Sequence, residues 1–206
     1  QVYHNHLTAE TGIELVFVSD GKQIYIGQTT DVQNIDSYTM RDRSRPKRDA
    51  FVGMLPPKLA QTLINLATGK QPADDETGSL TIVDPFCGTG VILQEALLMG
   101  YPIYGTDNSP KMVDYSRANL EWLTTKCNTA HLDSRVELAD ATTYQWDFAA
   151  HSMAIASETY LGQPLGGQHP TPEKLHQIIH DCNEIIRAFL KNIASQLPAG
   201  TPLCIA

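Results

Sequence analysis

Short runs of β-branched and other apolar residues alternate along this chain with longer segments whose apolar positions recur every three or four residues. The short runs have the length of buried strands, and they span residues 81–83, 103–105, 135–138, 153–157 and 202–206. The longer segments have the spacing of amphipathic helices, and they span residues 55–67, 91–98, 110–123 and 172–197. This alternation predicts an α/β fold built on a doubly wound, mostly parallel sheet.

The segment before the sheet has a different pattern. Two β-rich runs, residues 13–18 and 24–26, are separated by an Asp-Gly pair, which favours a tight hairpin turn. Polar and then basic residues follow, and they predict a linker without regular structure. We therefore expect a small hairpin with a basic linker over residues 1–50 and a sheet domain over residues 51–206. Within that domain, residues 69–79 have the composition of a surface loop.

The stretch TIVDPFCGTG, residues 81–90, joins a predicted strand to a predicted helix through a glycine-rich turn. Asp84 comes at the carboxyl end of the strand, and Pro85 ends strand pairing because it has no N–H to donate. Gly88 and Gly90 allow the backbone to turn sharply and to approach a ligand closely. The pattern predicts the nucleotide-binding corner of a doubly wound sheet, with backbone N–H groups at the start of a helix.

This corner could bind a dinucleotide, the phosphates of a nucleotide in a P-loop, or S-adenosylmethionine. A dinucleotide site requires a third glycine, where this chain has Leu93, and a P-loop requires a Lys-Ser/Thr pair, which does not follow Gly90. S-adenosylmethionine has no pyrophosphate but carries a cationic sulfonium and an amino-acid group, which suit the carboxylate of Asp84. An ordinary strand–helix turn is the remaining alternative.

Acidic residues also follow the next two predicted strands. Asp107 lies 107 − 84 = 23 residues after Asp84, close to the spacing of about 20 at which an acid binds ribose hydroxyls in nucleotide folds. Asn108 is expected to assist it. Asp140, after the third strand, either caps the next turn or binds the ligand, and we favour binding because it is the third acid at a strand end.

At these motifs the chain resembles the THUMP-associated RNA methyltransferases, and among them the tRNA guanosine-10 N2-methyltransferases. The resemblance lies in DPFCGTG and in YTMRDRSRPKRDAFVGMLPPKLAQTLINLA (38–67), YGTDNSPKMVDYSRANLEW (104–122) and ETYLG (158–162). It implies a Rossmann-like class I methyltransferase fold, S-adenosyl-L-methionine as cofactor, and methyl transfer to an exocyclic base amine, foremost guanine N2 in tRNA. It also implies cofactor binding by Asp84, Phe86, Cys87, Gly88, Thr89, Gly90, Asp107, Asn108, Asp140 and Ala141.

The fourth strand ends at the position where amino-methyltransferases carry an Asp, Asn or Ser, two prolines and an aromatic residue. Here Ser157 and Tyr160 keep the outer positions, while Glu158 and Thr159 replace the prolines. We predict Ser157, Glu158 and Tyr160 as catalytic residues. Ser157 Oγ, the backbone carbonyl after it and Glu158 are the candidate acceptors for hydrogens of the amine, and the tyrosine is expected to stack on a splayed base. A catalytically impaired scaffold subunit that binds the cofactor, or an N-methyltransferase acting on DNA or protein, is the alternative.

The net charge of −8 argues against a free-standing nucleic-acid binder. Basic residues nevertheless cluster in the linker, and we predict a substrate-binding role for Arg41, Arg43, Arg45, Lys47 and Arg48, with a solvated linker as the alternative. No THUMP module fits before the hairpin. Recognition of tRNA is therefore expected to require an additional RNA-binding domain or an activating protein subunit.

Other features narrow the class of protein. The sequence has no apolar run of about 18 residues and no signal-peptide pattern, which predicts a cytoplasmic protein without membrane contact. The four cysteines lack C-x-x-C spacing, and Cys182 and Cys204 are expected in the core. No metal site is predicted, although His176 and His180 stand one helical turn apart. Trp146 suits either a core position or a lid over the adenine. The chain begins with Gln1 and ends inside a predicted strand, which leaves open that it is a fragment.

Overall fold

The structure is a computed structural model, and it describes residues 6–7, 12–49, 54–69, 80–127, 129, 132–148, 152–162, 165 and 170–206. The chain divides into two compact units, Gln1–Ser44 and Arg45–Ala206. The loop expected at residues 69–79 lies outside the described residues, except for Gly69.

The first unit contains the predicted hairpin. Strands β1 (Leu15–Ser19) and β2 (Ile24–Gln28) pair antiparallel, with Ser19 opposite Ile24 next to the turn. The carboxylate of Asp20 accepts hydrogen bonds from the backbone N–H groups of Lys22 and Gln23, both at 2.8 Å, which closes the turn. The hairpin prediction is confirmed.

A helix follows the hairpin where the sequence predicted only a linker. Helix α1 (Ile35–Arg43) begins at Asn34, whose side chain accepts a hydrogen bond from the backbone N–H of Ser37 at 2.9 Å. The linker prediction was wrong because apolar periodicity does not mark this short helix, which is mostly polar. Its local signals are the capping Asn34, the acidic Asp36 in the first turn and the basic Arg41 and Arg43 in the last turn.

The second unit is built on a five-stranded sheet in the order β5-β4-β3-β6-β7, and every pair in it is parallel. The strands are β3 (Leu80–Asp84), β4 (Ile103–Asp107), β5 (Ser134–Leu138), β6 (Ser152–Ser157) and β7 (Leu203–Ile205). Strands β4 and β5 follow β3 on one side of the sheet, whereas β6 and β7 lie on its other side. The strand order therefore reverses between β3 and β6. Ligands of such sheets bind in the crevice outside the carboxyl ends at that point. The predicted α/β class is confirmed.

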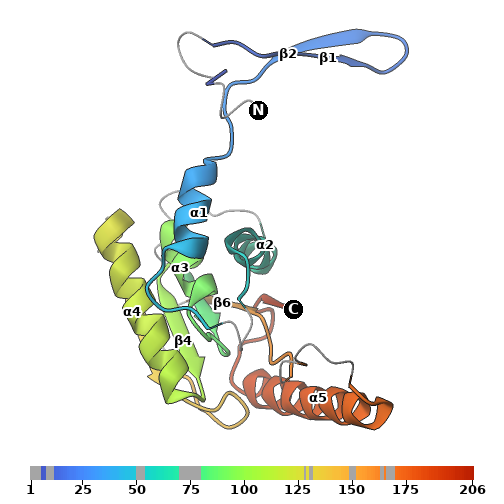
Figure 1. Ribbon diagram of the computed structural model, residues 1–206. Coiled ribbons are helices and arrows are strands. Elements are labelled where there is room, and N and C mark those ends of the chain that lie inside the picture. Colours follow the sequence, from blue (N-terminus) through green and yellow to red (C-terminus); the bar gives the residue numbers. More distant parts are fainter. Residues whose placement is uncertain are drawn as a thin grey trace. The chain divides into compact units, whose positions relative to one another are not determined.

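Three helices cover one face of this sheet: α2 (Pro57–Thr68), α3 (Val91–Leu98) and α4 (Pro110–Cys127) (Figure 1). Their apolar side chains form one cluster with Ile82, Ile103 and Ala154 of the strands. Helix α3 is buried along nearly its whole length, including Glu95, whose carboxylate accepts a hydrogen bond from Gln61 at 2.7 Å. This layer therefore holds the start of α3 firmly against the end of β3.

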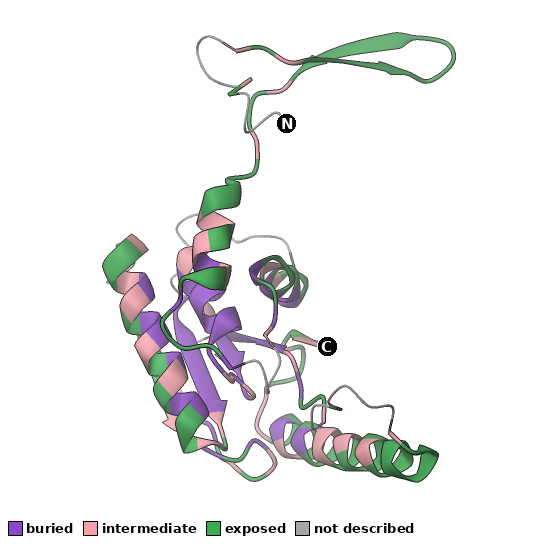
Figure 2. Cartoon of the chain, in the orientation of Figure 1, coloured by how far each residue is buried: buried purple, intermediate pink, exposed green. Residues whose placement is uncertain are grey.

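The other face of the sheet is covered less completely. Helix α5 (Pro172–Ala194) forms within the segment predicted as an amphipathic helix, but only Phe189 and Ile193 are buried. Leu175 and Ile179 remain 41% and 50% exposed, and the outer end of the helix is exposed in Figure 2. The apolar spacing correctly predicted a helix but could not reveal whether anything covers its stripe.

A second apolar cluster lies between α5 and the sheet. Trp146 is buried there, with ring centroids 6.5 Å from Phe189, so its place is in the core and not over a ligand. The expectation that Cys182 and Cys204 lie in the core was wrong for Cys182, which is only partly buried, whereas Cys204 is partly buried and packs against the cluster under α2, α3 and α4. They belong to α5 and to the short outer strand β7, where cover is thin.

Gly105 provides a test of the packing between sheet and helices. A Cβ at this position on β4 would lie 2.4 Å from Cδ1 of the buried Leu93 and 3.2 Å from Cβ of Cys87. We expect Gly105→Ala to lower the free energy of unfolding by about 1–3 kcal/mol, because α3 must move away from the sheet. Urea unfolding measures this change.

Gly27→Ala is the matched control, because the nearest heavy atom to its added Cβ is 4.0 Å away. It should change the stability by no more than about 0.5 kcal/mol. Equal midpoints for Gly105→Ala and the wild type would contradict this account of the packing.

Candidate functional site

The glycine-rich turn leads directly from β3 into α3. Gly88 and Gly90 have φ angles of 50° and 81°, a region that favours glycine. A Cβ on Gly90 would lie 2.4 Å from Oγ of Ser116 on α4, so a larger residue would disturb both the turn and the helix behind it. The N–H of Gly90 donates to the carbonyl of Cys87 at 2.7 Å, which closes the turn.

Asp107, at the end of β4, joins this turn to the next helix. Its Oδ2 accepts the N–H of Gly88 and its Oδ1 accepts the N–H of Ser109, both at 2.9 Å. Burial raises the pKa of Asp107, and the two backbone hydrogen bonds oppose the rise. Each oxygen has a further lone pair, so the carboxylate can still accept ligand hydroxyls.

Asp84 and Ser157 meet where the strand order reverses, at the ends of β3 and β6. Ser157 Oγ donates to Asp84 Oδ1 at 2.6 Å, and the N–H of Phe86 donates to the same oxygen at 3.2 Å. Asp84 is 2% exposed and Ser157 is 0% exposed. Burial raises the pKa of Asp84 to about 7; its two hydrogen bonds lower it, whereas the neighbouring Asp107 and Glu158 raise it further.

The segment after β6 is held by hydrogen bonds in place of the two prolines. The backbone N–H and the Oγ1 of Thr159 both donate to the carbonyl of Ala206, each at 2.9 Å. Glu158, between these anchored residues, is partly exposed, and burial raises its pKa. Tyr160 is 38% exposed.

Several predicted cofactor residues support the turn from within the protein. The ring of Phe86 makes an edge contact with Phe189 at 5.1 Å, and Cys87 is buried beneath the turn, where burial raises the pKa of its thiol. Thr89 is also buried, and its carbonyl accepts a hydrogen bond from Asn119. These side chains position the backbone, and a ligand role for them stays a prediction.

Three further residues predicted to bind the cofactor follow the ends of β4 and β5: Asn108, expected to assist Asp107 at the ribose, and Asp140 with Ala141. Asn108 and Asp140 are exposed, and Ala141 is buried. Oδ1 of Asp140 accepts hydrogen bonds from the backbone N–H and the Oγ1 of Thr142 at 2.9 and 2.7 Å. The contacts of Asp140 are those of a residue that caps a turn. Cofactor binding by this residue stays a prediction.

The basic cluster is distributed over both units. Arg41, in the first unit, is buried and lies 4.4 Å from the centre of the Tyr38 ring, and Arg45, in the second, is also buried. Arg43, Lys47 and Arg48 are exposed. Buried guanidinium groups are poorly placed for phosphate, so exposure favours these last three residues as substrate contacts.

Asn119 on α4 was not identified from the sequence, yet it joins the basic segment to the glycine-rich turn. Its Oδ1 accepts the N–H of Lys47, and its Nδ2 donates to the carbonyls of Lys47 and Thr89, all at 2.9 Å. The side chain is fully buried. An asparagine on the apolar face of a predicted helix was the available signal, since buried amides require partners.

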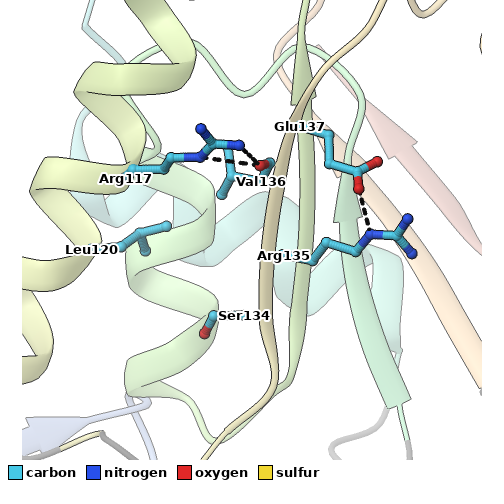
Figure 3. A pocket seen from close by; sticks show the side chains of 6 residues that line it. All are labelled: Arg117, Leu120, Ser134, Arg135, Val136 and Glu137. Atoms are coloured by element: carbon cyan, nitrogen blue, oxygen red, sulfur yellow. Dashed lines mark hydrogen bonds and ion pairs between the residues drawn. The ribbon is translucent and has the colours of Figure 1, made fainter.

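A separate hollow of about 390 Å³ lies along the outer edge of β5. Figure 3 shows Arg117 of α4 reaching across to the strand, where its Nε and Nη2 donate to the carbonyl of Val136 at 3.2 and 2.6 Å. Arg135 and Glu137 form an ion pair on the strand itself. Charged side chains on an edge strand hinder pairing with other chains, which accounts for this arrangement without a ligand.

The described part of the chain lacks both a cluster of metal ligands and a membrane-spanning helix. No group of three His, Cys, Asp or Glu residues there could hold a metal ion. His176 and His180 are exposed on α5. None of the described helices combines the length and apolar character needed to cross a bilayer.

The buried carboxylate of Asp84 predicts an unusual pH dependence of stability. An ordinary aspartate loses its proton near 3.8, whereas folded Asp84 loses it near pH 7. Between these values the folded state holds the extra proton, so stability falls as the pH rises. Asp84→Asn should remove this fall and make the ligand-free chain more stable than the wild type at pH 8, by up to about 4 kcal/mol.

Urea unfolding at pH 5 and pH 8 measures the effect. Asp114→Asn, at an exposed position on α4, is the control and should keep the wild-type pH dependence. Parallel pH profiles for Asp84→Asn and the wild type would show that Asp84 is ionised without cost in the folded chain.

Comparison with known proteins gives a consistent result. Residues 45–137 match the family model described as the RMKL-like methyltransferase domain. The chain is 32% identical over 167 residues to the tRNA (guanine(10)-N2)-dimethyltransferase of Methanothermobacter thermautotrophicus, covering 80% of this chain and 42% of the relative. It is 35% identical over 109 residues to the protein of the same name from Pyrococcus abyssi, covering 52% of this chain and 29% of the relative.

Among solved structures, TrmN from Thermus thermophilus superposes with a TM-score of 0.52 at 21% identity, covering 94% of this chain and 48% of that chain. This likeness supports the fold alone. The chain spans less than half of the length of each of these three proteins. The match to the RMKL-like methyltransferase domain ends in β5, and it includes β3, the glycine-rich turn and the acid-bearing strand β4.

Proposed function

We propose that this chain transfers a methyl group from S-adenosyl-L-methionine to an exocyclic amine of a nucleic-acid base, and specifically to guanine N2 in tRNA. The observation that carries the proposal is the placement of Asp84 and Asp107 at neighbouring strand ends, on either side of the glycine-rich turn. The names of the two archaeal relatives support the choice of substrate.

The residues present suit this methyl donor. The donor is cationic at its sulfonium and amino groups and carries ribose hydroxyls, whereas a dinucleotide would bring a pyrophosphate. Asp84 offers a carboxylate for the cationic part, and Asp107 offers acceptors for the hydroxyls. Gly88 and Gly90 carry no side chains at the turn, which allows the backbone to approach a ligand closely. When bound, the donor supplies a methyl group already activated for displacement.

The protein then has to position a weak nucleophile, because the lone pair of a guanine amine is delocalised into the ring. In-line alignment and exclusion of water contribute most of the acceleration in such a displacement. Tyr160 is exposed beside the end of β6 and offers a face on which a base pulled out of its helix can stack. The hydrogen bonds of Thr159 hold this segment, which favours a working site over a scaffold that has lost its activity.

Substrate RNA would approach over the segment that contains Lys47 and Arg48. Asn119 fixes the backbone of Lys47 to the turn at Thr89, so these cations lie at a defined place relative to the donor. The net charge of −8 leaves little general attraction for RNA, so we propose that an additional RNA-binding domain or a partner subunit supplies further affinity. The unpaired cysteines fit the reducing cytoplasm as the location.

A methyl-transfer assay on unmodified tRNA with tritiated donor tests the function. We expect incorporation at guanine N2 by the wild type, and we expect Asp107→Ala to weaken S-adenosylhomocysteine binding at least tenfold in calorimetry, because the ribose loses its acceptors. Donor binding without transfer to tRNA, DNA or protein would identify the chain as a scaffold subunit. Tighter binding of NAD than of S-adenosylhomocysteine would overturn the proposal.

Loss of the exposed cations should affect RNA binding and leave the chemistry intact. We expect Lys47→Ala and Arg48→Ala each to raise the KM for tRNA several-fold and to reduce the salt dependence of binding by about one phosphate contact. The donor affinity should not change. Lys126→Ala, at the far end of α4, is the matched control. Equal KM values for Lys47→Ala and Lys126→Ala would show that RNA does not follow this segment.

A further inference from the structure

Two polar residues at the end of β6 differ in their access to solvent: Ser157 is buried and Glu158 is partly exposed. Ser157 is 0% exposed and donates its hydroxyl hydrogen to Asp84 at 2.6 Å. The carbonyl of Ser157 accepts the N–H of Ala206 at 3.1 Å. A substrate amine cannot reach an oxygen that protein atoms enclose on all sides, so this hydroxyl is poorly placed to accept a hydrogen from the substrate.

Glu158, the next residue, differs from Ser157 in its exposure and in the hydrogen bonds of its side chain. It is partly exposed, and no hydrogen bond or ion pair of its carboxylate is found among the described residues. It lies close enough to Asp84 for its negative charge to raise the pKa of that residue. The carboxylate of Glu158 therefore lies within electrostatic range of the strand ends that hold the proposed donor site.

The backbone around Glu158 is restrained on both sides. Thr159 donates two hydrogen bonds to the carbonyl of Ala206, and the N–H of Ala206 donates to Ser157. Ala206, the residue after β7, thus anchors both neighbours of Glu158, and only the side-chain torsions of the glutamate remain to be set. A group held in this way needs little reorganisation when a substrate arrives.

We propose that Glu158 is the catalytic residue that accepts the hydrogen of the substrate amine, and that Ser157 is a positioning residue that holds the carboxylate of Asp84. This assignment rests on the proposed function. The position that usually supplies the acceptor in amino-methyltransferases is thus buried here, and the following residue replaces it.

In the methyl transfer, the amine nitrogen forms a bond to the methyl carbon. The carbon–sulfur bond breaks, and its electron pair stays on sulfur to give a neutral thioether. The nitrogen gains positive charge as the bond forms, and its proton passes to the carboxylate of Glu158 and then to solvent. Burial raises the pKa of Glu158, which makes it a stronger base than an exposed glutamate.

Steady-state kinetics on unmodified tRNA and calorimetry with S-adenosylhomocysteine separate the two roles. Glu158→Gln should lower kcat about 100-fold, since it removes the proton acceptor, and should leave the affinity for S-adenosylhomocysteine within about twofold of the wild type. Glu158→Asp should recover part of kcat. Glu173→Gln, an exposed glutamate in the first turn of α5, is the matched control and should keep full activity.

Ser157→Ala should show the reverse pattern. We expect the affinity for S-adenosylhomocysteine to fall about tenfold, because Asp84 loses a hydrogen bond that orients it, and kcat at saturating donor to remain within a few-fold of the wild type. Full kcat in Glu158→Gln, or a loss of kcat in Ser157→Ala without a change in affinity, would overturn the assignment. Absence of transfer by the wild type would instead refute the proposed function.

Discussion

Parallel pairing of β3 on both of its edges is the constraint on which the rest of the site depends. With β4 on one side and β6 on the other, the carboxyl ends of three strands meet at one edge of the sheet. Asp107, Asp84 and Ser157 end these strands and so become neighbours, although they are far apart in the sequence. The layer of α2, α3 and α4 holds this edge in place, because α3 starts directly at the glycine-rich turn.

The same arrangement places an ionisable group where it is costly to keep charged. Asp84 is enclosed at the point where the strand order reverses, and two donors, the hydroxyl of Ser157 and the N–H of Phe86, only partly offset its burial. A cationic ligand would favour the ionised form. Carboxylates with raised pKa values are common at functional sites, where stability is lower than an uncharged residue would allow.

The two faces of the sheet differ in how completely they are covered. Three helices bury the strand residues on one face, whereas α5 contributes only Phe189 and Ile193 to the other. The cluster around Trp146 fills part of that second layer. The edge that holds the candidate site depends mainly on the first layer. The glycine-rich turn leads into α3, Ser109, which donates to Asp107, directly precedes α4, and α4 supplies the Asn119 bridge to the basic segment.

The sequence by itself determined the order of strands and helices, the hairpin and the turn with Asp84, Gly88 and Gly90. These depend on local residue types, such as an Asp-Gly pair or a short β-branched run, whose preferences act within a few neighbouring residues. It failed at α1, where few apolar residues mark a helical face. It also placed candidate residues at the ends of the right strands.

Only the tertiary structure decided which of those residues are buried and which are open to solvent. The hydrogen bond between Ser157 and Asp84 spans 73 positions, and Asn119 reaches Lys47 across 72. The burial of Ser157 and the exposure of Glu158 depend on which strands pair and on how β7 anchors the segment after β6. Local spacing shows that a side chain lies at the end of a strand, whereas its partners and its access to solvent are set by residues distant in sequence.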